Sequence, residues 1–280
     1  MIDLHIHSSL SDGTDSPKEI IELINIKGIK TFSITDHDNI EAHKQIECQY
    51  MELIKEYGLN YISGVEFSTD YHGRTMHILV YGYNSKDEFI NLVVEHIHAL
   101  RIERFSRRIE DLSTYFSINF TQEELEWLYS RNNPGKPHIA RLLVKNGYAK
   151  DMSEAFAKFM PEKLGNYKVD AVELVKRLSS HGYLVGIAHP LGGEGEQRIS
   201  ISRFESNVQE LVKYGIKFLE CYYCLYNEKE REIIKMVADK YGLLVSGGSD
   251  YHGINKDIEL GDLGVDYDPD IQDLTILKKF

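Results

Sequence analysis

The chain has 280 residues, of which 42% are hydrophobic, and its formal net charge at pH 7 is -12. This length and apolar content allow a sizeable core, and a barrel of this size can be a single domain. No apolar run approaches the roughly 20 residues of a membrane-spanning helix, and the acidic balance disfavours binding to a long nucleic-acid duplex.

The chain begins MIDLHIHSS, which lacks the basic and apolar regions of a signal peptide. It contains three cysteines, and such a low, odd number fits a reducing compartment. We therefore expect a cytoplasmic protein with no membrane partner.

Strands and helices are predicted to alternate along most of the chain. Runs of apolar, β-branched and aromatic residues predict strands at 2–8, 31–37, 61–68, 77–83, 183–190, 218–223 and 243–250. Helices are predicted at 16–28, 40–57, 204–214 and 228–241. The first helix has Ser16 at its N-cap, Pro17 in its first turn and Gly28 beyond its end. This alternation is typical of parallel βα units in an α/β protein.

One connection departs from the alternation. Only the segment TDYHGRTM separates VEFS from HILVYGY. Because this segment is too short for a crossover helix, the sequence predicts an antiparallel hairpin.

Residues 86–182 interrupt the strands with helical patterns. A long amphipathic helix is predicted at 86–116, and shorter helices follow at 121–130, 137–146, 152–160 and 168–181. We expect residues 1–85 and 183–280 to form a barrel with the functional site. Residues 86–182 are then a helical insertion beside the mouth of the barrel that contributes to substrate binding.

Histidines and carboxylates gather at the ends of the predicted strands. The histidines are His5, His7, His37, His77, His189 and His252, and the carboxylates are Asp3, Asp12, Asp36, Glu66 and Asp250. The carboxyl ends of the strands build the active site of an α/β barrel. A lone histidine there is more often a hydrogen-bonded structural residue, but the whole set predicts a metal site.

The spacing of these residues suits metal binding. His5 and His7 are two apart on a strand, so both leave the same face. The hairpin should place His77 beside Glu66, which could bridge two cations. The segment GGSDYH contains small residues that leave room for ions. Surface or capping roles are expected for the residues outside these groups: Asp38, His43, His72, His96, His98 and His181.

These motifs resemble those of the PHP family, named for polymerase and histidinol phosphatase domains. The matching segments, in order, are DLHIHS with SDG, TDHD, GVE, MH, AHP and GSDYH, and they cover nearly the whole chain. The resemblance implies a distorted seven-stranded β/α barrel that holds two or three divalent metal ions. Histidine and carboxylate ligands without cysteine suit Mn²⁺, Fe²⁺ or Zn²⁺.

The resemblance also implies three sets of ligands. The first ion would be held by His5, His7, Glu66 and Asp250. The second would be held by Glu66, His77 and His189, with Glu66 bridging. The third would be held by Asp12, His37 and His252. Such ions would activate a water molecule to attack a phosphoester. Asp36 would then orient a ligand or handle a proton, or else hold a turn.

The insertion resembles a narrower group. The segment KPHIAR, followed by NGY, is similar to stand-alone PHP phosphoesterases, which remove the 3′-phosphate of 3′,5′-bisphosphonucleotides or trim short RNA from its 5′ end. Substrate binding is accordingly expected of Arg101, Arg104, Lys136 and His138. The two arginines could instead lie on a solvated helix face.

The expected partner is thus a small phosphorylated molecule, either a nucleotide or a short oligoribonucleotide. A histidinol-phosphate phosphatase is an alternative, although it would not need the helical insertion. A metal-binding regulatory protein without activity is an alternative of another class.

Overall fold

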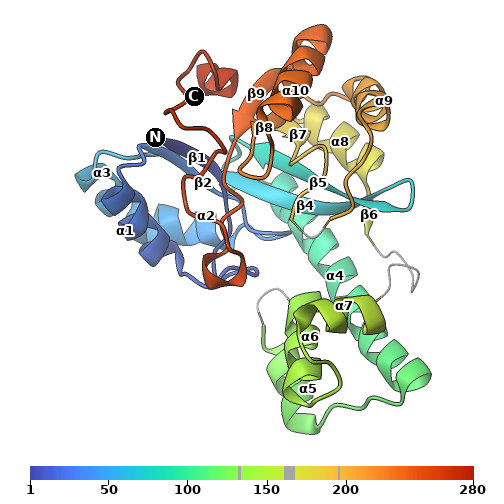
Figure 1. The fold of residues 1–280 in the computed structure, drawn as a ribbon. Coiled ribbons are helices and arrows are strands. Elements are labelled where there is room, and N and C mark those ends of the chain that lie inside the picture. Colours follow the sequence, from blue (N-terminus) through green and yellow to red (C-terminus); the bar gives the residue numbers. More distant parts are fainter. Residues whose placement is uncertain (132–133, 161–167, 195) are drawn as a thin grey trace.

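The computed structural model describes residues 1–131, 134–160, 168–194 and 196–280, which form an α/β fold (Figure 1). The strands are β1 (Ile2–Ile6), β2 (Thr31–Ile34), β3 (Asn60–Tyr61), β4 (Gly64–Tyr71), β5 (Arg74–Tyr81), β6 (Val169–Asp170), β7 (Leu184–Ile187), β8 (Phe218–Tyr222) and β9 (Leu244–Gly247). The helices are α1 (Pro17–Lys27), α2 (Glu41–Gln45), α3 (Met51–Glu56), α4 (Glu88–Phe116), α5 (Gln122–Tyr129), α6 (Lys136–Lys145), α7 (Met152–Phe159), α8 (Ala171–Ser180), α9 (Ile201–Val212) and α10 (Glu228–Tyr241).

The described strands form two sheets. The smaller is parallel, in the order β1-β2-β3, and the larger is mixed, in the order β6-β4-β5-β7-β8-β9. In the larger sheet β5 runs antiparallel to both β4 and β7. The predicted hairpin is therefore confirmed, but its strands are longer than predicted, since Tyr71 already pairs with Arg74.

Two isolated bridges connect the sheets. Ile6 pairs with Tyr251 beyond the end of β9, and His37 pairs with Glu66 on β4. The predicted α/β class is confirmed. The predicted single closed barrel of seven strands is not confirmed, because the described strands separate into these two hydrogen-bonded sheets.

Local signals in the sequence account for the helix boundaries. Ser16 and Glu19 form a capping box at the start of α1, and Gly28 ends it with a left-handed φ of 73°. The helix predicted at 40–57 is divided, because a π-helical turn at Ile46–Tyr50 separates α2 from α3. The helix predicted at 204–214 begins earlier, where the side chain of Ser200 caps α9.

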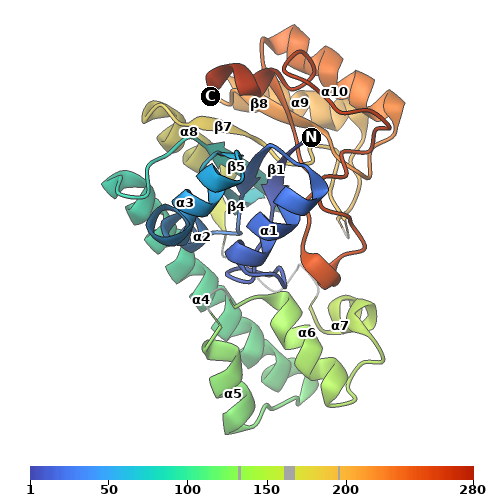
Figure 2. The same ribbon diagram turned by 90° about the vertical axis from the view of Figure 1, so that its left-hand side faces the viewer.

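The helices α5, α6 and α7 lie at the far end of α4, away from the sheets (Figures 1 and 2). They share with α4 a hydrophobic cluster of their own, which runs from Phe105 to Met160. In contrast, β6 pairs with β4, and α8 contacts the larger sheet. Residues 132–133 and 161–167 of the predicted insertion lie outside the described part of the chain.

The helix α4 has 29 residues. Within the described ranges, neither it nor any other helix combines the length and apolarity needed to span a membrane.

A buried tyrosine links the two sheets. The hydroxyl of Tyr81 on β5 donates a hydrogen bond of 2.6 Å to the carbonyl of Leu4 on β1. Tyr81 is 1% exposed, so this bond is shielded from water. The contact fixes the distance between the strands that carry His5 and His77.

We predict that Tyr81→Phe lowers the free energy of unfolding by about 1–3 kcal/mol, because it leaves the buried Leu4 carbonyl without its donor. Urea denaturation measures the change. Tyr115→Phe is a matched control, since Tyr115 is 66% exposed, and it should change stability by less than about 0.5 kcal/mol. Equal losses in the two variants would contradict the role assigned to the Tyr81 hydroxyl.

Candidate metal centre

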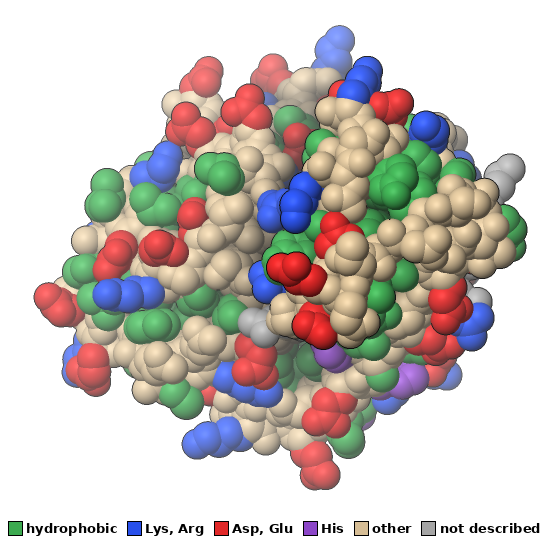
Figure 3. Space-filling model, turned by 90° about the horizontal axis from the view of Figure 1, so that it is seen from below, with side chains coloured by type: hydrophobic (Ala, Val, Ile, Leu, Met, Phe, Trp, Pro, Cys, Tyr) green, Lys and Arg blue, Asp and Glu red, His purple; other side chains and the backbone are tan. Residues whose placement is uncertain are grey.

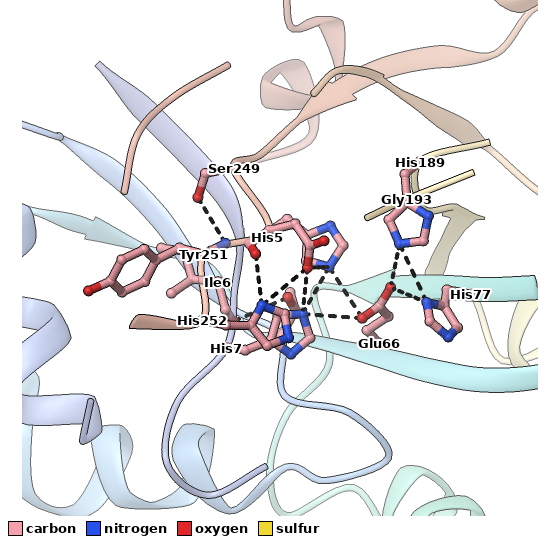
Figure 4. A network of polar contacts seen from close by, with 12 residues as sticks. His5, Ile6, His7, Glu66, His77, His189, Gly193, Ser249, Tyr251 and His252 are labelled. Atoms are coloured by element: carbon pink, nitrogen blue, oxygen red, sulfur yellow. Dashed lines mark hydrogen bonds and ion pairs between the residues drawn. The ribbon is translucent and has the colours of Figure 1, made fainter. Parts of the chain in front are cut away.

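The predicted ligands converge at the junction of the two sheets. Figure 4 shows Glu66 between the imidazoles of His5 and His7 on one side and those of His77 and His189 on the other. The clusters that could hold a metal ion together contain His5, His7, Asp12, His37, Glu66, His77, His189, Asp250 and His252. All nine residues predicted as ligands therefore lie together.

The first group has the geometry of a small coordination shell. His5 Nε2 lies 3.1 Å from His7 Nε2 and 3.3 Å from Glu66 Oε2. His7 Nε2 lies 3.2 Å from the same Glu66 oxygen and 3.3 Å from Asp250 Oδ1. Ligand atoms about 2.0–2.1 Å from a tetrahedral ion are roughly 3.3 Å apart. His5, His7 and Asp250 form one candidate cluster, and Glu66 Oε2 faces both of its rings.

The second group uses the other oxygen of Glu66. Oε1 lies 3.2 Å from both His77 Nδ1 and His189 Nε2, and these nitrogens are 3.4 Å apart. The hairpin register explains the approach, since His77 pairs with Ser68, two residues from Glu66 on the same face of β4. Glu66 is thus placed to bridge two ions.

The third group surrounds Asp12. His252 Nε2 lies 3.4 Å from its Oδ1, and His37 Nε2 lies 3.8 Å from its Oδ2. His7 Nδ1 is 3.8 Å from Asp12 Oδ1, so His7 faces two groups with its two nitrogens. The distances between side chains are longer in this group than in the first, and the side chain of Asp12 is 26% exposed.

The chemistry of the donors fits cations. Glu66 Oε2 and His7 Nδ1 are buried and have no hydrogen-bond partner. Burial raises the pKa of Glu66, but the imidazoles of His37 and His5 lower it well below its ordinary value. Burial lowers the pKa of His37 to about 3, which keeps this ring neutral and able to act as a ligand. The residues present therefore fit a metal centre.

Asp36 holds a turn. Its carboxylate accepts hydrogen bonds of 2.7 and 2.6 Å from the backbone N–H and hydroxyl of Ser8, and one of 2.6 Å from the hydroxyl of Ser11. These bonds fix the loop that carries Asp12. The geometry thus supports the turn-holding alternative rather than contact with a reacting group.

Two residues expected on the surface are buried, so that expectation was wrong for them. Asp38 is 1% exposed, and its Oδ2 accepts hydrogen bonds from Nε and Nη2 of Arg101 at 2.9 and 2.5 Å. His43 is 5% exposed and packs against Tyr61 and Tyr83. The partner of Asp38 is 63 residues away along the chain, which sequence spacing does not reveal.

The other histidines outside the groups lie nearer to solvent. His72, His96 and His181 are exposed, as expected, while His98 is half-buried. Gly248 also differs from its predicted role. A Cβ atom there would lie 2.3 Å from Cβ of His5, so this glycine makes room for His5 rather than for an ion.

Four charged residues near the centre escaped the sequence reasoning. Glu196 lies 3.3 Å from His189 Nδ1 and could join His77 and His189 as a ligand. Lys256 pairs with Asp250 at 2.6 Å. Glu220 lies 2.9 Å from His5 Nδ1, and Lys168 lines the same cavity as His77 and His189.

A cavity of about 370 Å³ connects the metal ligands to a group of cations. Its lining includes Asp12, His37, His77 and His189 at one end, and the predicted residues Arg101, Arg104, Lys136 and His138 together with Lys168. The arginines therefore face this cavity rather than a solvated helix surface. Burial and the neighbouring Arg104 and Lys136 lower the pKa of Lys168 to about 7.

Comparison with known proteins identifies the class. The PHP domain family matches residues 3–244. The chain is 26% identical to a 5′-3′ exoribonuclease of Haemophilus influenzae, covering 92% of each chain, and 26% identical to a 3′,5′-nucleoside bisphosphate phosphatase of Chromobacterium violaceum, covering 90% of this chain and 87% of that one. A solved structure from Bifidobacterium adolescentis, assigned as a metal-dependent phosphoesterase, superposes with a TM-score of 0.77 at 26% identity, covering 95% and 92% of the two chains.

The chain therefore belongs to the PHP domain family of metal-dependent phosphoesterases. Its catalytic class is that of a hydrolase acting on phosphoric esters.

We predict that Asp12→Ala or His252→Ala removes about one metal ion per chain and lowers turnover by at least about tenfold, because either change opens the third group. Elemental analysis after dialysis measures the ion content. His72→Ala is the control, since the side chain of His72 is exposed and belongs to none of the ligand groups. Full ion content and wild-type turnover in both variants would rule out a third ion there.

Proposed function

We propose that this protein hydrolyses the 3′-phosphate of nucleoside 3′,5′-bisphosphates, or trims short 5′-phosphorylated RNA, with two or three bound divalent ions. The observation that carries this proposal is the cavity that joins the candidate metal centre to a cluster of cations. A substrate with two phosphates would place one at the candidate ligands and the other at the cations. The names of the Haemophilus and Chromobacterium relatives support the same substrate class.

The proposed ligand sets are those implied by the resemblance, whereas the clusters in the structure also group Glu66 with His5 and His189, and with His37 and His77. The first ion would take His5, His7, Glu66 and Asp250, the second Glu66, His77 and His189, and the third Asp12, His37 and His252. When bound, Mn²⁺, Fe²⁺ or Zn²⁺ ions supply a hydroxide nucleophile at neutral pH and offset charge on the phosphoryl oxygens.

The ring of strands β1, β2, β4, β5, β7, β8 and β9 is proposed to be the distorted seven-stranded barrel implied by the resemblance. The bridges between His37 and Glu66 and between Ile6 and Tyr251 support this assignment, because they lie at the two seams between the sheets. The division into 1–85 with 183–280 and an insertion at 86–182 is likewise proposed.

The chain's own residues would bind and orient the second phosphate. Asp38 holds Arg101 through an ion pair in which Nε and Nη2 of Arg101 both donate to Asp38 Oδ2, and this pair keeps the guanidinium at the wall of the cavity. Arg104 is one turn further along α4, and burial together with Arg101 lowers its pKa to about 10. Cations that repel one another in a cavity are stabilised most when a dianion binds between them. The insertion thus supplies the groups that recognise substrate.

A short substrate fits the charge distribution. The formal net charge is -12, and acidic and basic side chains are interspersed over the face seen in Figure 3. No broad basic surface on this face could follow a long duplex. A small phosphorylated partner in the cytoplasm is the consistent choice.

Histidinol phosphate is the second candidate substrate. It carries one phosphate, so the cations at the far end of the cavity would have no phosphate to bind. A non-catalytic regulatory protein would bind ions without hydrolysing a phosphoester. An assay of phosphate release therefore distinguishes it from a nucleotide phosphoesterase and from a histidinol-phosphate phosphatase.

We expect Mn²⁺-loaded protein to release phosphate and AMP from adenosine 3′,5′-bisphosphate and to lose this activity after chelation. Phosphate release with histidinol phosphate and a short 5′-phosphorylated RNA in parallel measures the preference. Activity restricted to histidinol phosphate would overturn the nucleotide assignment. Inactivity on all three despite full ion occupancy would overturn the proposed function.

We predict that Arg104→Ala raises KM for the bisphosphate by about tenfold or more, while KM for a generic phosphomonoester changes little, because one charge-assisted contact contributes about 1.5–3 kcal/mol. Steady-state kinetics on both substrates measures the difference. Arg107→Ala is the matched control, since Arg107 lies on the exposed side of α4 beside Glu103. Equal effects on the two substrates would argue against contact with a second phosphate.

A further inference from the structure

Glu220 is a fully buried carboxylate that belongs to none of the ligand groups. It lies on β8 and is 0% exposed. The pairing of β8 with β9 shifts register between Glu220 and Tyr222, and such irregularities often redirect a side chain. A buried carboxylate is unfavourable unless it is hydrogen-bonded, so its two contacts explain its presence.

One oxygen of Glu220 contacts a candidate ligand. Oε1 lies 2.9 Å from His5 Nδ1, while His5 Nε2 faces Glu66 Oε2 at 3.3 Å and Asp250 Oδ1 at 3.7 Å. A histidine can bind an ion through Nε2 only when the ring proton is on Nδ1. Because an ionised carboxylate only accepts hydrogen bonds, Glu220 holds the proton of His5 on Nδ1.

The other oxygen holds a second candidate ligand through its backbone. The N–H of His189 donates a hydrogen bond of 2.7 Å to Glu220 Oε2. His189 has a φ of 25°, a conformation that non-glycine residues rarely adopt without support from their surroundings. This conformation leaves His189 Nε2 3.2 Å from Glu66 Oε1. Glu220 thus contacts candidate ligands from β1 and from the end of β7.

We propose that Glu220 is a positioning residue for the metal centre: it fixes the tautomer of His5 and the backbone of His189, so that both rings present Nε2 to the ions. This inference rests on the proposed metal-dependent function but concerns ion binding alone. It can therefore be tested without a substrate.

The variant Glu220→Gln tests the proposal with little change in volume. Its amide can accept from only one of the two donors. When its oxygen accepts from His189, its NH₂ faces His5 Nδ1 and favours the proton on Nε2, which blocks coordination. We expect the affinity for Zn²⁺, measured by competition with a chromophoric chelator, to fall about tenfold to a hundredfold.

Glu47→Gln is the matched control. Glu47 Oε1 also lies near a histidine, 3.3 Å from His43 Nε2, but this pair is outside the metal centre. It should leave Zn²⁺ affinity unchanged. Wild-type affinity in Glu220→Gln, or an equal loss in Glu47→Gln, would overturn the proposal.

A double-mutant cycle separates positioning from a general effect on folding. If Glu220 acts partly through His5, Glu220→Gln should cost less Zn²⁺ affinity in a His5→Ala background than in the wild type. Additive losses would contradict action through His5.

A measurement on the unaltered protein avoids the risk that a variant does not fold. Side-chain nitrogen NMR of the Zn²⁺-loaded wild type should show His5 with its proton on Nδ1 and with Nε2 bound to the ion, and coordination through Nδ1 or a proton on Nε2 would overturn the proposal. Because these readouts are ion affinity and tautomer, failure of the wild type to hydrolyse any phosphoester would remove the proposed function and leave this inference standing.

Discussion

The arrangement of this protein depends on burying a carboxylate among imidazoles at the junction of two sheets. Glu66 is 0% exposed, and its two oxygens face the rings of His5 and His7 on one side and of His77 and His189 on the other. Buried ionisable groups are unfavourable unless they are paired or bind metal. Divalent cations satisfy both kinds of group at once, since carboxylates and neutral imidazoles are both ligands.

The surrounding fold keeps the imidazoles and carboxylates close together in two ways. Glycines replace larger side chains where strands approach, and hydrogen bonds hold buried carboxylates in place. Gly64 has no room for a side chain, because a Cβ atom there would lie 2.2 Å from Ser33 Oγ. Asp3 accepts hydrogen bonds from the N–H and hydroxyl of Ser249 and from the N–H of Gly261, which ties β1 to the segment that carries Asp250. Burial raises the pKa of Asp3 to about 6 despite these bonds. Asp3, which lies outside the candidate ligand groups, therefore supports the segment that carries Asp250.

The sequence predicts which histidines and carboxylates lie together, because their signals are local. His5 and His7 are two apart on one strand, and Asp250 and His252 follow another. The hairpin that brings His77 to Glu66 also follows from a short connection. These features need only the periodicity of a strand and the rule that parallel strands end at a common edge.

Supporting residues could not be predicted in the same way, because their roles depend on partners far along the chain. Asp38 and Arg101 are 63 residues apart, and His5 and Glu220 are 215 apart. In the sequence, Glu220 is one more polar residue in the apolar run FLECYY, and Asp38 is an ordinary turn residue. The division of the strands into two sheets also escaped prediction, since single bridges at the seams leave no periodic signal.

The pair between Asp38 and Arg101 connects the two ends of the cavity. Asp38 follows His37 directly, and its Oδ1 accepts from the N–H of Ser68 on β4. Arg101 lies on α4, which begins beside the sheets and ends in the separate helical cluster. Two N–H groups of Arg101 donate to one oxygen of Asp38, so this buried pair restrains the orientation of the guanidinium. The pair therefore holds the loop that carries the candidate ligand His37 against the helix that carries Arg101 and Arg104.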